Sequence, residues 1–427
     1  MASPYSAYRA IVGGAEHDLI ARLAGWVKGS NLVMVNSTRD GGGVAEILRN
    51  MVPLMNELGV ETTWEIIEGR PDFFAATKTL HNALHGRAED MTPGMVKAYW
   101  EVSEANAANL KDRLDKPIVF IHDPQPAGLL RSLKKEGRKW IYRCHVDVSS
   151  PYPPAWDFLG PIMDQYDASV FSHPSFARKM AKPQFLIAPS IDPLSDKNKP
   201  LPEDFIRRTL ERFQLDPKRP LITQVSRFDK LKDPLGVIEA FQKVKKRHPE
   251  TQLLLAGGAA SDDPESAHIL PAIREAAGKD DSIHVLDLPP FSDLEINALQ
   301  RASSVVLQKS LKEGFALTVA EALWKEKPVV AMAVGGIPLQ VLPGKTGYLV
   351  HSLEGTAAAI LRVLENPTEA AHLARNGREH VRQNFLVTRH IRDYLSLFLC
   401  VLNPGKDVLR LGESIKKGGV NYGGRVG

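Results

Sequence analysis

Apolar residues in this chain gather in short runs, and longer segments with helical spacing separate these runs. Continuous runs of Val, Ile and Leu are typical of strands that are covered on both faces of a sheet. We therefore expect strands at residues 32–36, 63–67, 118–122, 140–145, 168–172 and 185–188 in the first half, and at 221–226, 252–256, 283–286, 304–308, 329–333 and 347–350 in the second.

The segments between these runs predict helices. Between residues 44 and 58, for example, apolar positions recur at intervals of three and four, which places them on one helical face. Strands that alternate with helices predict parallel sheets with right-handed crossovers. The expected fold class is therefore α/β, with two Rossmann-like, doubly wound parallel sheets.

The length of 427 residues exceeds what one hydrophobic core usually serves, so two domains are expected. Residues 190–202 are polar and rich in proline, which is typical of a boundary. We expect domains at residues 1–195 and 196–394, facing each other across a cleft where ligands bind beyond the carboxyl ends of the strands. The tail of about 395–427 either stays flexible or packs back on the first domain.

Composition and charge exclude several classes of function for this chain. The net charge of +4 is small, and no dense basic stripe with interleaved aromatic residues is present, so nucleic acid is not an expected partner. The two cysteines, Cys144 and Cys400, give no metal-ligand spacing and fit a reducing compartment. Without an apolar run of about 20 residues or a signal-peptide pattern, the chain is expected to be soluble, cytoplasmic and not bound to membranes.

Two carboxylates eight residues apart, Glu313 and Glu321, flank a turn that Gly314 opens into a helix. Such a turn offers backbone N–H groups to phosphate, and each carboxylate can accept two sugar hydroxyls. Thr318 and Glu321 also have the spacing of a capping box, which would make Glu321 purely structural. Taken alone, the segment favours neither interpretation.

Two further loops follow predicted strands. Residues 36–43 end in three glycines before a helix, which lets the backbone approach an anion closely, although a tight turn would need the same residues. This loop is neither a dinucleotide fingerprint nor a P-loop. In residues 225–234, Arg227 and Lys232 suit a diphosphate, although exposed cations are usually solvated.

His and Asp recur at two strand ends in the first half, as His122-Asp123 and as His145 with Asp147. We expect both pairs to point into the cleft. A lone histidine in such a place is more often structural than catalytic, but two sites on neighbouring strands favour a functional role. His145 and Asp147 are too few ligands for a metal site, and none is expected.

These sites, in chain order, resemble those of the retaining nucleotide-sugar glycosyltransferases of the GT-B fold, in glycosyltransferase group 1, family 4. Arg227 and Lys232 match the family's diphosphate pair, and Glu313 and Glu321 match its Glu-x7-Glu motif. Blocks at residues 36–48, 77–84, 122–126, 143–151 and 321–325 are similar to the trehalose glycosyltransferring synthases. The resemblance runs from about residue 35 to 338.

The resemblance implies reversible transfer of glucose from ADP-glucose or UDP-glucose to free glucose, which gives trehalose. It implies catalytic roles for His145, Arg227, Lys232 and Glu313, the last of which would accept hydroxyls of the transferred glucose. The resemblance also implies that Glu321 would accept the ribose hydroxyls. The other implied donor contacts are Gly41, Gly42, Gly43, Gly314, Phe315, Leu317 and Thr318. The implied acceptor contacts are Asp40, Asp123, Gln125 and His145.

No cofactor is expected to be obligatory, and stimulation by added Mg²⁺ stays open, as do a homodimer, the preferred base and the physiological direction. The expected partners are small molecules. Four alternatives also stay open: a trehalose phosphorylase, another hexosyltransferase of the same fold, a nucleotide-sugar epimerase and a sugar- or nucleotide-binding regulator without turnover.

Overall fold

The computed structural model of this protein describes residues 4–134, 136–258 and 266–405. Two parallel six-stranded sheets form its framework, with strand orders β2-β1-β3-β4-β5-β6 and β12-β11-β10-β7-β8-β9. All the predicted strands are present, with ends that differ by at most two residues. They are β1 (Leu32–Asn36), β2 (Thr62–Ile66), β3 (Ile118–His122), β4 (Lys139–Arg143), β5 (Ala168–Phe171), β6 (Gln184–Leu186), β7 (Leu221–Val225), β8 (Gln252–Gly257), β9 (Ile283–Asp287), β10 (Val305–Gln308), β11 (Val329–Met332) and β12 (Tyr348–Val350).

Helices cover both faces of each sheet, because successive strand residues point to opposite sides. In β1, Val33 and Val35 join one buried core, whereas Leu32 and Met34 join the core on the opposite face. The helices are α1 (Arg9–Val12), α2 (Gly14–Val27), α3 (Gly42–Glu57), α4 (Pro71–Leu84), α5 (Pro93–Leu110), α6 (Leu130–Leu133), α7 (Pro153–Met163), α8 (Glu203–Arg212), α9 (Pro234–Lys245), α10 (Ser266–Ala277), α11 (Asp293–Ala302), α12 (Leu317–Trp324), α13 (Leu353–Glu365), α14 (Pro367–Asn384) and α15 (Val387–Leu402).

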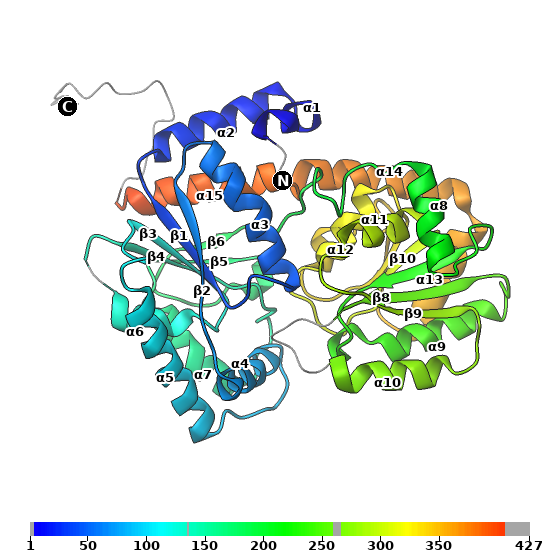
Figure 1. Ribbon diagram of the computed structural model, residues 1–427, viewed down its shortest axis with the longest axis horizontal. Helices are drawn as coiled ribbons and strands as arrows, with labels where there is room; N and C mark the ends of the chain where they lie inside the picture. The colour runs from blue at the N-terminus through cyan, green and yellow to red at the C-terminus, as the bar shows by residue number, and fades with distance from the viewer. Residues whose placement is uncertain (1–3, 135, 259–265, 406–427) are drawn as a thin grey trace, which may run out of the picture.

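We call the first sheet with α1 to α7 and α15 the N-terminal lobe, and the second sheet with α8 to α14 the C-terminal lobe. The lobes lie side by side, the first in blue and cyan and the second in green and yellow (Figure 1). The orange helices α14 and α15 run across both, and α15 packs against α2 and α3. The predicted α/β class with two doubly wound parallel sheets is confirmed.

The chain crosses between the lobes twice, and the two crossings lie together. Ile191 and Leu386 form a parallel bridge. The N–H of Ile191 donates to the carbonyl of Phe385 at 2.9 Å, and the N–H of Val387 donates to the carbonyl of Ile191 at 2.9 Å. The predicted boundary at residue 394 therefore lies inside α15, which already belongs to the N-terminal lobe. Residues 406–427 of the predicted tail lie outside the described residues.

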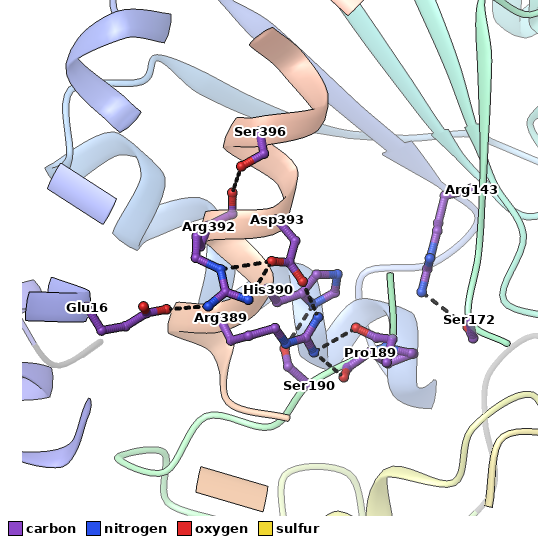
Figure 2. A network of polar contacts seen from close by, with 11 residues as sticks. Glu16, Arg143, Ser172, Pro189, Ser190, Arg389, His390, Arg392, Asp393 and Ser396 are labelled. Carbon is purple, nitrogen blue, oxygen red and sulfur yellow. Dashed lines mark hydrogen bonds and ion pairs between the residues drawn. The ribbon is translucent and has the colours of Figure 1, made fainter. Parts of the chain in front are cut away.

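A polar network fixes α15 to the first crossing (Figure 2). The buried Arg389 donates through Nη2 to the carbonyl of Pro189 at 2.9 Å. In the next residue, His390, the Nδ1 atom lies 2.9 Å from Ser190 Oγ. Because these bonds are buried, loss of either partner would leave a costly unsatisfied group, so the start of α15 is held firmly in place.

Candidate active site

One cavity of about 520 Å³ lies between the lobes, at the carboxyl ends of strands from both sheets. This volume is in the range of small-molecule sites, which are usually about 300–1,000 Å³. Every donor, acceptor and catalytic residue that the resemblance implies lines it: Asp40, Gly41, Gly42, Gly43, Asp123, Gln125, His145, Arg227, Lys232, Glu313, Gly314, Phe315, Leu317, Thr318 and Glu321. Their individual roles stay predictions, but the structure brings all of them together.

The glycine loop of the N-terminal lobe leads directly into α3. Gly41 and Gly42 have φ angles of +78° and +77°, a conformation that favours glycine. Gly43 faces the other lobe, where a Cβ atom would lie 3.1 Å from Leu317 Cδ1. The N-termini of α3 and α12 thus meet across the cavity, and both bring the positive end of a helix dipole to it.

Glu313 lies on the loop between β10 and α12 and is almost fully buried. Three donors converge on its Oε1 atom: Lys232 Nζ at 2.7 Å, Ser310 Oγ at 2.8 Å and Gln308 Nε2 at 3.0 Å. Only glycine fits beside this loop at position 335, because a Cβ there would overlap the carbonyl of Glu313. The carboxylate is therefore held in one orientation beside a lysine.

The capping-box interpretation of Glu321 is wrong. The N-cap of α12 is Ala316, in a left-handed conformation and without a side-chain capping bond. Thr318 lies inside the helix, and both its Oγ1 and Glu321 Oε2 accept from Gln300 Nε2, at 3.1 and 3.0 Å. Glu321 is buried at the cavity wall and does not cap its own helix.

A positive field crosses the cavity from the C-terminal lobe. Arg227 is about one-third exposed and lies 3.4 Å from the carboxylate of Asp229. On the opposite wall, burial and then the charges of Lys78, Arg227 and Lys232 lower the pKa of His81 to about 3. The cations of the predicted diphosphate pair therefore act on the same space, which would favour an anionic ligand.

The two histidines at neighbouring strand ends contact each other. His122 Nδ1 lies 3.1 Å from His145 Nε2, and their rings are stacked. Burial lowers the pKa of both, for His122 to about 3, so both are neutral. Asp123 accepts the backbone N–H of His145 at 2.7 Å, which fixes that histidine. The expectation for Asp147 is wrong: it is buried away from the cavity and accepts the N–H of Ser149 at 2.9 Å, since it closes a local turn.

One feature of the N-terminal wall bears on a second ligand. Gln125 Oε1 is buried and lacks a hydrogen-bond partner among the described residues, so a ligand hydroxyl would satisfy it.

Gly314 packs so closely on the carbonyl of His145 that a Cβ at position 314 would overlap it. The lobes therefore touch beside the cavity, and the two walls are held close together.

Several lining residues had no role in the sequence interpretation. Gly257 is the last residue of β8 and Gly258 follows it, and a Cβ at position 257 would overlap the carbonyl of Ser226. A glycine pair after an apolar run could have marked this part of the cavity in the sequence. Glu46 and Lys197 also line the cavity, although they are far apart in sequence. Lys197 lies in the predicted boundary segment and Glu46 lies in a predicted helix, and no local pattern connects the two.

Among residues 4–134, 136–258 and 266–405, no group of three or more His, Cys, Asp or Glu side chains could hold a metal ion. Across the same ranges, the helices are too short or too polar to cross a bilayer.

Comparison with known proteins agrees with this geometry. Residues 206–380 match the family model of glycosyl transferases group 1, and residues 34–178 match the model of the trehalose synthase N-terminal domain. The two facing sheets and these matches define a glycosyltransferase of the GT-B fold. The trehalose synthase of Thermococcus litoralis is 45% identical over 91% of this chain and 95% of its own length, and that of Rubrobacter xylanophilus is 42% identical over 92% and 96%. The chain belongs to the trehalose synthase family.

More distant similarities were also found. A trehalose phosphorylase of Pleurotus pulmonarius is 29% identical over 82% of this chain but only 54% of its own length. Among solved structures, the trehalose-6-phosphate synthase OtsA has a TM-score of 0.72 at 17% identity, covering 87% of this chain and 99% of that one. An α,α-trehalose-phosphate synthase of Burkholderia xenovorans gives 0.71 at 15% identity, covering 87% and 100%. At such identities the structures support the fold alone.

Proposed function

We propose that this chain is a retaining glycosyltransferase that makes trehalose by reversible transfer of glucose from a nucleoside-diphosphate glucose, such as ADP-glucose or UDP-glucose, to free glucose. The observation that carries the proposal is the contact of Lys232 with Glu313 at 2.7 Å in the cavity between the lobes. In this cavity Lys232, a cation suited to a diphosphate, lies next to Glu313, a carboxylate suited to sugar hydroxyls. The trehalose synthases that are 42–45% identical support the disaccharide product.

The main electrostatic task in this reaction is to stabilise the diphosphate as it leaves. Arg227 and Lys232 provide positive charge, and the first N–H groups of α3 and α12 have no acceptors within their own helices. These groups would receive the diphosphate oxygens from both lobes. The charge needed at the leaving group is thus available from the chain itself, and a comparison of rates with EDTA and with added Mg²⁺ tests this point.

The carboxylates and the histidine would arrange the sugars. Glu313 would accept hydroxyls of the transferred glucose, while Glu321 would accept those of the ribose. On the N-terminal wall, Gln125 has a buried oxygen that finds no hydrogen-bond partner in the described part of the chain, which suits a hydroxyl of the acceptor glucose. His145, neutral and held by Asp123, would line the place where the two sugars meet.

Retention of configuration follows from attack on the face that the diphosphate leaves. The bond from the anomeric carbon to the phosphate oxygen breaks, the acceptor hydroxyl oxygen bonds to that carbon, and its proton passes to the departing phosphate oxygen. Three donors already share the charge of Glu313 Oε1, which weakens this oxygen as a covalent nucleophile. A glucosyl adduct trapped on Glu313 would contradict this mechanism.

A direct test incubates the purified protein with glucose and each nucleoside-diphosphate glucose in turn, and follows trehalose and nucleoside diphosphate. Equal amounts of both products are expected from at least one donor. Release of nucleoside diphosphate without trehalose, or no reaction with any donor, would contradict the proposal.

A trehalose phosphorylase is the second candidate, because fungal trehalose phosphorylases are 29% identical to this chain. Trehalose is incubated with phosphate in one reaction and with ADP or UDP in another. Nucleotide-sugar formation supports the synthase, whereas glucose 1-phosphate formation supports the phosphorylase. The binding regulator is excluded by turnover in either reaction.

A further inference from the structure

Lys197, in the segment between the lobes, contacts a carboxylate from each lobe. Its Nζ lies 2.7 Å from Oε2 of Glu46, on α3 of the N-terminal lobe. It also lies 3.6 Å from Oε1 of Glu321, on α12 of the C-terminal lobe. All three residues line the cavity, and their side chains are 17%, 20% and 1% exposed. One ammonium group therefore stands between two carboxylates at the lobe interface.

The segment that carries Lys197 is fastened to the C-terminal lobe. Asn297, on α11, donates to the backbone carbonyls of Asp196 and Lys199, both at 2.8 Å. Arg301 donates to the carbonyls of Asn198 and Lys199 at 3.0 Å. Lys197 consequently moves with Glu321, and its bond to Glu46 is a contact between the lobes.

A second chain of bonds holds the other oxygen of Glu321. Gln300 Nε2 donates to Oε2 at 3.0 Å, and Gln300 Oε1 accepts from Lys325 Nζ at 2.7 Å. Lys325 also donates to Oδ1 of Asn198 at 2.8 Å, the residue next to Lys197. Both oxygens of Glu321 are thus oriented by contacts that return to the same linker, which leaves the remaining lone pairs for a ligand.

Charge explains why this lysine matters. Burial lowers the pKa of Lys197, but the charges of Glu321 and Glu46 raise it, and the net shift is upward, so the lysine is positively charged. Without it, the carboxylates of Glu46 and Glu321 would face the same space with no ammonium group between them, and like charges repel one another. A Glu321 side chain turned away from Glu46 would be poorly placed to accept ribose hydroxyls.

We propose that Lys197 is a positioning residue, which orients Glu321 for the ribose of a nucleoside diphosphate and, through Glu46, links that recognition to the N-terminal lobe. The inference rests on the proposed function, in which Glu321 binds the ribose. It adds a specificity role to a residue outside the diphosphate pair and the two motif carboxylates.

The test compares ribose recognition in Lys197→Met and in the wild-type protein. Calorimetry measures dissociation constants for ADP and UDP, for their 2′,3′-dideoxy counterparts and for inorganic pyrophosphate. The wild-type protein should prefer the ribonucleotide at least about tenfold, since a site built for hydroxyls rejects a ligand that lacks them. In Lys197→Met this preference should fall below about threefold, while pyrophosphate affinity is unchanged because Arg227 and Lys232 remain.

Lys199→Met is the matched control, because Lys199 lies on the same linker but its side chain is 42% exposed and pairs with Asp196. It should keep the wild-type preference. If Lys197→Met does not fold, Lys197→Gln takes its place with the same expectation.

Each outcome decides the inference. A retained ribonucleotide preference in the Lys197 variant would overturn it, as would an equal loss of nucleotide and pyrophosphate affinity, which indicates general damage. If the wild-type protein itself shows no preference, the ribose role of Glu321 in the proposed function fails first, and the inference fails with it.

Discussion

Gly314→Ala tests whether the contact between the lobes is needed for catalysis. Position 314 lies between Glu313 and Phe315 on the cavity wall, and an added Cβ would overlap the backbone carbonyl of His145 in the other lobe. Backbone cannot swing aside as a long side chain can. To restore a separation of 3.0 Å, the two walls would have to move apart by about 1 Å.

The expected loss of activity follows from that displacement. Glu313 is held by donors at 2.7 to 3.0 Å, and the sugars must reach groups on both walls. A misplacement of about 1 Å can cost on the order of 100-fold in rate, or about 2.7 kcal/mol of transition-state stabilisation. We therefore expect kcat/KM for glucosyl transfer to fall about 100-fold.

Steady-state kinetics with nucleoside-diphosphate glucose and glucose measure this loss, and thermal unfolding checks that the variant is folded. Gly25→Ala is the matched control, because that exposed glycine on α2 has no atom within 4 Å of an added Cβ. It should keep wild-type kinetics. A folded Gly314→Ala protein with kcat/KM within threefold of wild type would refute the reasoning.

Three more predictions follow from the site. Glu313→Ala should cost about 2–4 kcal/mol in transition-state stabilisation, measured as kcat/KM, because a fixed acceptor for the sugar is lost. Arg227→Ala should weaken both nucleoside diphosphate binding, measured by calorimetry, and transfer. Stability should fall as the pH drops from about 6.5 towards 3, by up to about 1.4 kcal/mol per pH unit for each buried neutral histidine, because these groups take up protons only on unfolding. Urea denaturation at several pH values measures this, and the histidines concerned are His81, His85, His122, His145 and His390.

Contrary results are equally clear. If Glu313→Ala turns over normally but melts earlier, the motif is structural. Intact nucleoside diphosphate binding in Arg227→Ala would remove the diphosphate assignment. A free energy of unfolding that stays constant between pH 6.5 and 4 would show that the buried histidines take up protons in the folded state.

Local pattern predicted most of the framework, because a buried strand needs a short apolar run whatever its neighbours are. The ends of β1, β3 and β7 also placed the candidate ligand residues, since parallel strands bring their carboxyl ends to one edge. Prediction stayed undecided where local spacing has two physical outcomes. The Thr-x-x-Glu spacing of residues 318–321 suits a cap, but the left-handed Ala316 is the N-cap, so the helix starts at Leu317 and Thr318 lies inside it.

Long-range contacts were beyond the reach of pattern. The bond between Glu46 and Lys197 joins residues 151 positions apart, and nothing in either neighbourhood points to the other. The predicted boundary at residue 394 placed the first half of α15 in the wrong lobe for a different reason. Its apolar positions are helical in spacing, as at Ile391, Tyr394, Leu395 and Phe398, but they pack on the N-terminal lobe, which only the return of the chain at Leu386 brings within reach.

The paired crossings at Ile191 and Leu386 make the C-terminal lobe an insertion within the N-terminal one. Both ends of the inserted lobe lie on adjacent backbone segments, as bridge partners do. A deletion variant in which a few glycines join residue 191 to residue 386 would therefore keep α15 in its native position. The product would contain about half of the chain and would keep His145 and Gln125 but neither Arg227 nor Glu313, so the N-terminal wall of the cavity could be studied alone.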